Sequence, residues 1–96
     1  MVYLNMKDWE LIGFRKSNKL HKKYDAILRN YDTNQMRIIS FGDNRFMNYD
    51  DKTMLNAYPE LIHRDKSRRK LFRMRQKHNL REGFYSPSYF SFYYLW

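Results

Sequence analysis

The sequence predicts a small α+β domain that combines a β-hairpin, a basic helix and an aromatic C-terminal strand. Three observations support this prediction. Two segments with strand-like spacing flank a turn, a highly charged stretch begins with helix-capping residues, and aromatic side chains crowd the end of the chain. A chain of 96 residues is long enough for one domain only.

The composition excludes several classes of protein. Hydrophobic residues make up 43% of the chain, which is more than a disordered polyelectrolyte contains. The absence of cysteine excludes a disulfide framework, an iron–sulfur cluster and a cysteine-based zinc finger. The chain has no recognisable signal peptide and no run of about 20 apolar residues that would span a bilayer. We therefore expect no membrane association and no cofactor.

Residues 1–16 are interpreted as an N-terminal extension, and residues 17–96 as the domain that follows it. The apolar residues of the extension are spaced as well for a short helix as for an edge strand, so both assignments remain open. The polar and basic residues that follow are typical of a linker or of the entry to a strand.

Residues 22–29 and 36–41 are predicted to form the hairpin. The first segment has a period of two residues around Tyr24, Ala26 and Leu28, as in a strand with one buried face. The second is rich in residues that favour strands. The six residues between them include Asn and Asp, which tolerate a left-handed backbone and form local hydrogen bonds in turns.

The next two expected elements are helical. Residues 52–62 are expected to hold one helical turn, which Pro59 then ends. Asp65 or Ser67 is expected to cap a longer helix that runs to about His78. Because the apolar stripe of this helix is narrow, we expect it to pack along one seam on the sheet and to leave its other faces in water.

The end of the chain is predicted to be extended. Beyond Glu82 it carries no charge and has eight aromatic side chains in fourteen residues. Pro87 is expected to keep it out of a helix at that point, and Tyr89 to Leu95 is expected to lie as a strand across the hairpin. Since each aromatic ring buries roughly 150–250 Å², we interpret this tail as cover for the core.

Several short motifs follow one another in an order that is unusual as a set. They are Lys22-Lys23-Tyr24, Ile39-Ser40-Phe41-Gly42-Asp43, Tyr49-Asp50-Asp51, His63-Arg64-Asp65, Arg68-Arg69-Lys70 with Phe72 and Arg75, and Ser91 with Leu95-Trp96. This order resembles a small basic uncharacterised domain of large eukaryotic DNA viruses, of the mimivirus and phycodnavirus kind, which is also seen in some tailed phages. The resemblance covers residues 17–96. The chain departs from it at Gln76, where histidine is more common, and in a longer insert between Tyr49 and His63.

The resemblance implies a viral protein that is carried in the virion, and it implies no catalytic activity. Within the shared motifs, the residues interpreted as structural are Phe41, Gly42, Phe72, Arg75 and Trp96. For Arg75 we expect a hydrogen bond to a carbonyl of the tail, or stacking on an aromatic ring, that holds the helix to the sheet. A function carried over from this resemblance is an analogy.

Positive charge is concentrated in the last third of the chain. Residues 1–60 carry ten basic and eight acidic side chains, whereas residues 61–96 carry nine basic and two acidic ones. Cations four residues apart on a helix repel one another by a few tenths of a kcal/mol, a cost that an anionic partner would offset. The candidate contacts for such a partner are Arg64, Lys66, Arg68, Arg69, Lys70, Arg73, Lys77 and Arg81.

Three interpretations of this basic stretch remain open. The backbone of DNA or RNA would bind it strongly, with marked salt dependence and little sequence preference. An acidic protein surface, such as that of a capsid protein, would be held by arginine forks. The third interpretation is a solvated face that serves solubility.

The signals for catalysis are weak. The triplet His63-Arg64-Asp65 occurs in kinase catalytic loops, but the chain lacks the other kinase motifs, so we interpret the triplet as the entry to the helix. The three histidines are not spaced as metal ligands. The acidic residues that a magnesium-dependent nuclease would need are Asp43, Asp50, Asp51 and Glu60. We expect no enzyme, no metal and no small-molecule substrate.

The sequence therefore favours a non-enzymatic viral structural or binding protein. In this hypothesis it is a minor, capsid-associated component of the virion that bridges larger proteins through its basic helix. It would be found in the virion, and in the host cytoplasm or viral factory during infection. The alternative is a sequence-independent nucleic-acid-binding protein of the virion core, and a magnesium-dependent nuclease is a distant third.

Overall fold

The computed structural model describes residues 3–96 and confirms the α+β class. An antiparallel three-stranded sheet has the order β2-β3-β4, and a second sheet pairs β1 with β5. The strands are β1 (Leu4–Asn5), β2 (Trp9–Lys16), β3 (Tyr24–Asn30), β4 (Met36–Phe41) and β5 (Phe84–Tyr85). The helices are α1 (Lys66–Gln76) and α2 (Pro87–Phe90), with 3₁₀ turns at Pro59–Leu61 and Lys77–Asn79 and a π-helical turn at Ser91–Leu95.

The predicted hairpin is confirmed. β3 and β4 pair in register from Tyr24 opposite Phe41 to Arg29 opposite Met36. Asn30 closes the loop between them. Its side-chain oxygen accepts hydrogen bonds from the backbone N–H groups of Asp32 and Thr33. This is the local bonding that predicts a turn from asparagine.

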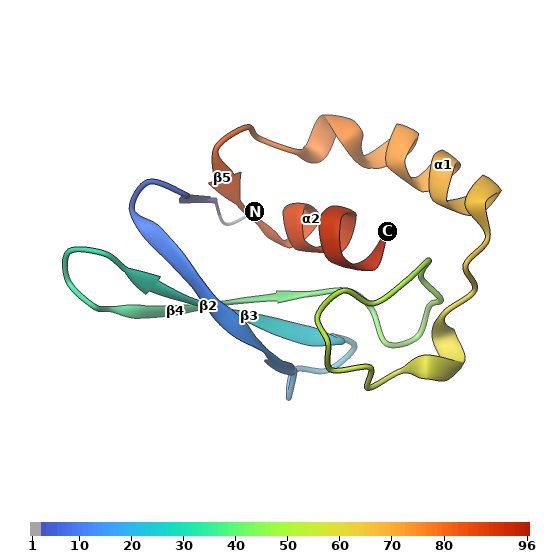
Figure 1. The fold of residues 1–96 in the computed structure, drawn as a ribbon, viewed down its shortest axis with the longest axis horizontal. Coiled ribbons are helices and arrows are strands. Elements are labelled where there is room, and N and C mark those ends of the chain that lie inside the picture. The colour runs from blue at the N-terminus through green and yellow to red at the C-terminus, as the bar shows by residue number, and fades with distance from the viewer. Residues whose placement is uncertain (1–2) are drawn as a thin grey trace.

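The predicted N-terminal extension contributes two strands to the fold. Of the two assignments left open for it, the structure shows a strand: β2 pairs along its length with β3, with one irregularity between Leu11 and Gly13. β1 pairs with β5, so the N-terminal strand lies beside the strand that directly precedes the C-terminal helix (Figure 1). Leu4 and Trp9 belong to the hydrophobic core.

The predicted C-terminal strand at Tyr89 to Leu95 is wrong, because this segment is helical. Ser86 caps the helix through its side-chain oxygen, which accepts from the Tyr89 N–H at 3.1 Å. Pro87 stands at the start of the helix, where its missing N–H has no intrahelical partner to lose and its fixed φ suits the helix. The expectation that Pro87 excludes a helix here is therefore also wrong. Four-residue spacing then places Phe90 and Tyr94 on one face.

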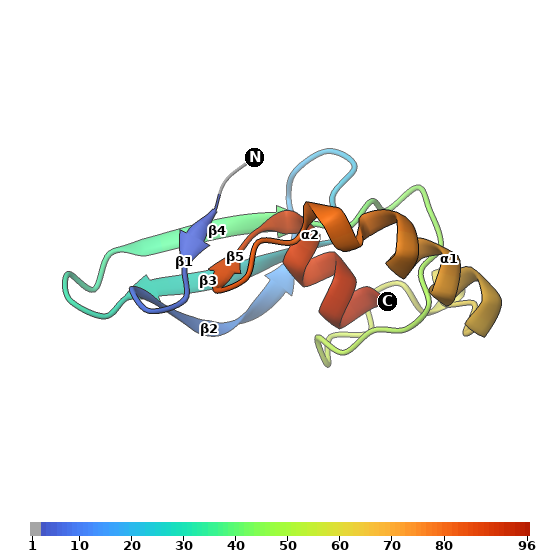
Figure 2. The same cartoon turned by 90° about the horizontal axis from the view of Figure 1, so that it is seen from above.

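The C-terminal helical segment, residues 87–95, forms the middle layer of the molecule. Figures 1 and 2 show α2 between the three-stranded sheet and α1. Phe90 and Leu95 are buried there, and the Phe90 ring centre lies 5.3 Å from that of Phe41 on β4 and 5.9 Å from that of Phe14 on β2. The core thus fills the space between the sheet and this segment.

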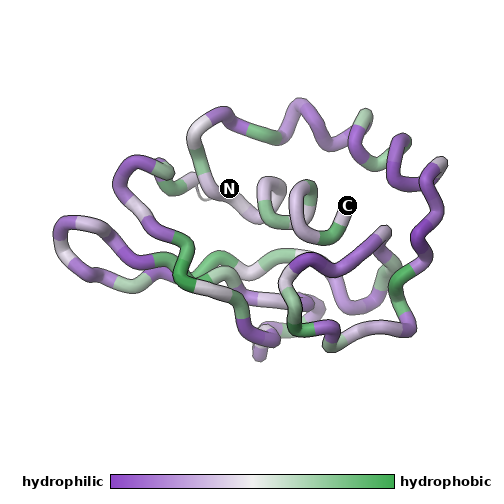
Figure 3. The backbone as a smooth tube through the Cα atoms, viewed as in Figure 1, coloured by the Kyte–Doolittle hydropathy of each residue, from purple (hydrophilic) through white to green (hydrophobic). Residues whose placement is uncertain are grey.

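The basic helix does not pack on the sheet, as the sequence predicted, but on the C-terminal segment. Phe72 of α1 stacks on Trp96 with ring centres 4.2 Å apart and planes 6° apart. No residue of α1 is buried, and Figure 3 shows it as mainly hydrophilic. The reason is that the aromatic tail already covers the sheet face that a basic helix would otherwise occupy.

The helical turn expected in residues 52–62 is displaced. Pro59 was expected to end it, but the only helical residues in this range are the 3₁₀ turn Pro59–Leu61, which Pro59 begins. Proline is favoured at the first position of a helix for the same reason as at Pro87. Residues 42–58 therefore connect β4 to this turn as a long irregular loop.

Replacement of Gly42 is expected to destabilise the protein by about 3 kcal/mol. Gly42 has φ +73°, and a Cβ there would lie 2.8 Å from Leu95 Cδ1 and 3.2 Å from Lys23 Cβ. Gly42→Ala would combine backbone strain of about 1 kcal/mol with overpacking of about 1–3 kcal/mol. The matched control is Gly83→Ala, because Gly83 has φ +80° and no atom within 4 Å of its virtual Cβ. Urea unfolding should show a loss for Gly83→Ala of only about 1 kcal/mol, and equal losses would contradict the packing argument.

Candidate anion-binding groove beside the basic helix

The basic helix is positioned by the residue that the sequence predicts as its cap. The Asp65 carboxylate accepts hydrogen bonds from the backbone N–H groups of Ser67 (2.9 Å) and Arg68 (3.2 Å). Asp65, rather than Ser67, is therefore the N-cap. The helix ends at Gln76 and continues as a 3₁₀ turn to Asn79, close to the predicted end at His78.

Two of the residues predicted to contact a partner form intramolecular contacts instead. Arg69 donates from Nε to the carbonyl oxygen of Trp96 at 2.7 Å, and its guanidinium lies 5.0 Å from the ring centre of Tyr49. Arg73 donates to the carbonyl oxygen of Phe92 at 3.3 Å and lies 4.1 Å from the centre of its ring. Burial lowers the pKa of the Arg73 guanidinium. These arginines attach α1 to the C-terminal segment.

Two more candidates also have intramolecular partners, but these lie beyond the ends of α1. Arg64 stands before the helix, with φ 53°, and approaches Asp50 with an N–O distance of 3.7 Å. Arg81 lies after it, over the rings of Phe84 (4.5 Å) and Tyr3 (5.7 Å). Arg81 thus reinforces the end of the fold where β1 meets β5.

The lysines of the predicted set form an exposed row. At 3.6 residues per turn, Lys66, Lys70 and Lys77 lie within about 40° of one another around the helical axis. All three are exposed. This row lies on a different part of the helix circumference from Arg68 and Arg75, which are seven residues apart and hence on nearly the same line along the helix. The basic stretch is thus divided into inward arginines, a lysine row and a flank with two arginines.

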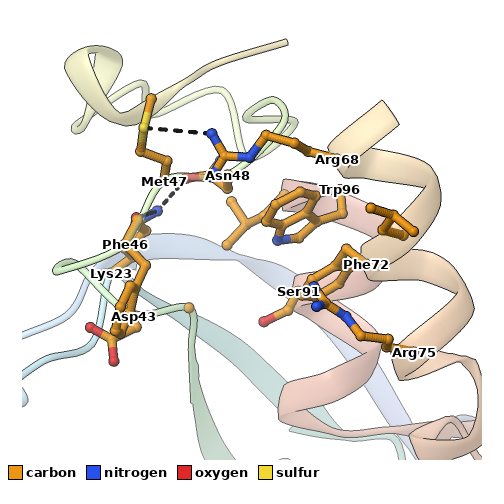
Figure 4. A pocket seen from close by; sticks show the side chains of 13 residues that line it. Lys23, Asp43, Phe46, Met47, Asn48, Arg68, Phe72, Arg75, Ser91 and Trp96 are labelled. Atoms are coloured by element: carbon orange, nitrogen blue, oxygen red, sulfur yellow. Dashed lines mark hydrogen bonds between the residues drawn. The ribbon is translucent and has the colours of Figure 1, made fainter. Parts of the chain in front are cut away.

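The flank with two arginines borders a groove. A cavity of about 550 Å³ lies between α1, the loop after β4 and the C-terminal segment (Figure 4). A second hollow of about 280 Å³ shares Gly42, Asp43, Phe72 and Ser91 with the first, so the two form one continuous groove. The structure places Arg75 on its wall, and among the described residues Arg75 makes neither the predicted hydrogen bond to a tail carbonyl nor the predicted stacking on an aromatic ring.

All five residues interpreted as structural from the resemblance border this groove. Phe41 and Gly42 belong to its floor, and Phe72, Arg75 and Trp96 to its wall. Of the eight predicted contact residues, Arg68 alone lines the groove.

Lys23 is a groove residue that the predicted contact set missed. It is only 2% exposed, and its Nζ donates to the carbonyl oxygen of Phe46 at 2.8 Å and to the side-chain oxygen of Asn48. Burial lowers the pKa of Lys23 to about 8, against the opposing effect of Asp43, Asp51 and Glu60. The available signal was a lysine directly before the inward-facing Tyr24 of a strand.

The histidine of the kinase-like triplet is a structural residue at the entry to α1, beside Trp96. His63 Nδ1 accepts a hydrogen bond from the Asp65 N–H at 2.9 Å, and its ring centre lies 5.2 Å from that of Trp96. Nε2 is buried without a hydrogen-bond partner among the described residues. Burial lowers the pKa of His63, and the nearby charges of Arg68 and Lys23 act in the same direction.

Three of the four acids considered for a nuclease, Asp43, Asp50 and Asp51, have separate local partners. Asp43 forms an ion pair with Arg45 at 2.7 Å, which holds the pKa of that carboxyl well below its usual range. Asp51 accepts from the hydroxyl groups of Tyr24 and Thr53. Within residues 3–96, no three histidine, aspartate or glutamate side chains come together as a metal site would require.

Comparisons with known proteins assign no family to the chain. The chain matches no protein-family model, no curated protein and no solved structure. The helices formed by residues 3–96 are too short and too polar to cross a bilayer. The chemistry of the groove is therefore the basis for any functional conclusion.

The inward and outward cations are expected to differ in their effect on stability. Arg69→Ala removes a charged hydrogen bond and a ring contact, so we expect a loss of about 2 kcal/mol in the free energy of unfolding. Lys70→Ala, one residue further on the exposed row, should change it by less than about 0.5 kcal/mol. Urea unfolding of both variants checks this, and an equal effect would show that Arg69 does not hold the helix.

The buried lysine is expected to give the protein an unusual dependence of stability on pH. Between about 8 and 10.5, the unfolded chain holds a proton on Lys23 that the folded chain has lost, so stability rises with pH. Burial raises the pKa of Tyr24 to about 12 from 10.0, so above pH 10 the folded chain holds the extra proton and stability falls. Urea midpoints should therefore peak near pH 10.

The control for this profile is Lys23→Met. It should abolish the rise that begins at about pH 8 and should keep the fall that begins near pH 10. A rise that persists unchanged in Lys23→Met would assign it to another group.

Proposed function

We propose that the protein is a non-enzymatic binding protein that attaches to an acidic surface of a larger protein through α1. The observation that carries this proposal is the division of the helix cations. Arg69 and Arg73 hold the helix in place, whereas Lys66, Arg68, Lys70 and Arg75 are exposed. A helix that is anchored by one set of cations presents the other set on a fixed support.

Exposed apolar residues beside these cations favour a protein partner over a bare phosphate backbone. Leu71 and Met74 are 58% and 66% exposed on α1. Exposed apolar side chains next to arginine are common at the centres of protein interfaces. Arginine also binds carboxylates through paired hydrogen bonds that lysine cannot form.

The resemblance to the domain of large DNA viruses supports a setting for this activity. In that setting the protein is a minor structural component of the virion and bridges capsid proteins, and during infection it occupies the host cytoplasm or viral factory. Mass spectrometry of virions separated into shell and core should find it in the shell in a fixed ratio to capsid protein. Absence from purified particles would overturn this setting.

A second candidate is a sequence-independent nucleic-acid-binding protein of the virion core. The exposed lysine row favours it, because Lys66, Lys70 and Lys77 lie on one line and are not held by the tail. Such a protein would bind a DNA duplex with an affinity that falls steeply as salt rises.

A charge-reversal experiment tests the proposed function. In the helix variant, Glu replaces Lys66, Arg68, Lys70 and Arg75. In the matched control, Glu replaces four basic residues that are exposed away from α1, which are Lys7, Lys19, Arg37 and Lys52. Both variants change the net charge equally. Fluorescence anisotropy with labelled polyglutamate should show binding by the wild type and the control, and a loss of about tenfold or more in the helix variant.

The same measurement with a labelled DNA duplex separates the two candidates. Duplex binding at about 50 mM salt that exceeds polyglutamate binding, and that falls in the helix variant alone, would favour the nucleic-acid-binding protein. Equal losses in the helix variant and the control would show that only net charge matters, which would contradict both.

A further inference from the structure

We propose that the groove beside α1 binds an extended segment of the partner protein in which acidic and apolar side chains alternate. This inference rests on the proposed function and names the site and the partner chemistry. The groove would hold a carboxylate at the Arg68–Arg75 flank and an apolar side chain at the rim near Leu71. The lysine row would lie outside the contact.

The dimensions of the groove suit a short extended peptide. Its two hollows run from Met47 and Arg68 at one end to Gln76 and Pro87 at the other. From Arg68 to Gln76 the helix rises by about 12 Å. At about 3.3 Å per residue, this length corresponds to about four residues of extended chain.

Basic side chains line both sides of the groove. Lys22 and Lys23 lie on the side of the sheet, and Arg68 and Arg75 lie on the side of the helix. Asp43 is the one acidic side chain among the lining residues, and it is already paired with Arg45 at 2.7 Å. The charge that the groove presents to a ligand is therefore positive.

The arginines keep most of their hydrogen-bonding capacity for a ligand. The contact of Arg68 within the described chain is with the sulfur of Met47 at 3.9 Å, which spans one end of the groove. Arg75 extends along the wall beside Ser91, and no described residue accepts a hydrogen bond from it or forms an ion pair with it (Figure 4). A free guanidinium binds a carboxylate with two parallel hydrogen bonds.

The rim of the groove supplies the apolar contacts. Phe46, Met47 and Leu71 line it and are 63%, 39% and 58% exposed. Large apolar side chains that remain exposed around a cavity mark an interaction site more often than a solvated face. Below them, the stacked rings of Phe72 and Trp96 form an aromatic wall of the groove.

Binding of short labelled peptides tests the proposal. The probe is fluorescein-labelled Gly-Glu-Leu-Glu-Leu-Glu-Gly, and its control has Gln in place of each Glu. We expect the wild-type protein to bind the acidic probe at least about tenfold more tightly than the Gln control, because each charged hydrogen bond adds to binding. Urea unfolding of every variant checks that the fold is kept.

Matched variants locate the binding site. The pair Arg68→Gln and Arg75→Gln together should weaken binding of the acidic probe by about tenfold or more. The pair Lys66→Gln and Lys70→Gln together removes the same charge from the lysine row of the same helix and should weaken it by less than about threefold. Leu71→Ser should weaken it by about threefold or more, because it removes the apolar contact at the rim.

The outcomes distinguish the groove from the proposed function. Loss of probe binding in the Lys66 and Lys70 pair but not in the Arg68 and Arg75 pair would overturn the groove and leave the proposed function intact. Absence of binding to both the acidic probe and polyglutamate would overturn both. Equal binding of the Gln control, or tighter binding of a labelled thymidine decamer, would also overturn the inference.

Discussion

Burial of the C-terminal helical segment, residues 87–95, is the constraint on which the rest of the structure depends. On one side, Phe90 and Leu95 complete the core over the sheet. On the other, the carbonyl group of Phe92 accepts a hydrogen bond from Arg73, and that of Trp96, directly after the segment, accepts one from Arg69. Since α1 has no buried residue of its own, these contacts and the ring of Trp96 provide the surface on which it packs. The groove exists because α1 is held away from the sheet by this layer.

The buried ammonium group of Lys23 holds the long loop after β4 in one conformation. An ion in an apolar site is costly unless its hydrogen bonds are satisfied. Here the loop supplies the acceptors, the carbonyl of Phe46 and the side chain of Asn48. Asn48 in turn pairs with the segment that leads to α1, through the N–H of His63. One charge therefore links the sheet, the loop and the entry to the basic helix.

Local signals could be predicted from the sequence, and contacts between distant segments could not. The hairpin around Asn30 and the cap at Asp65 depend on neighbouring residues, and both are confirmed. The C-terminal helix was missed because Tyr and Phe favour strands, which outweighed the Ser86–Pro87 start signal. Because of the same error, the sequence did not show that some cations of α1 bind within the molecule while others are exposed. The partners of Arg73 and Arg69 are carbonyl groups in the mispredicted segment and directly after it, so nothing local separated these arginines from Lys70.

The shallow attachment of α1 also bears on motion. A helix without buried residues, held by two guanidinium groups and one ring stack, detaches at a lower free energy than the sheet unfolds. The side of the groove formed by α1 is therefore held less firmly than the opposite side, which is attached to the core. A groove with one loosely held side can change its width to fit the size of a bound segment, while the core of the domain keeps its structure.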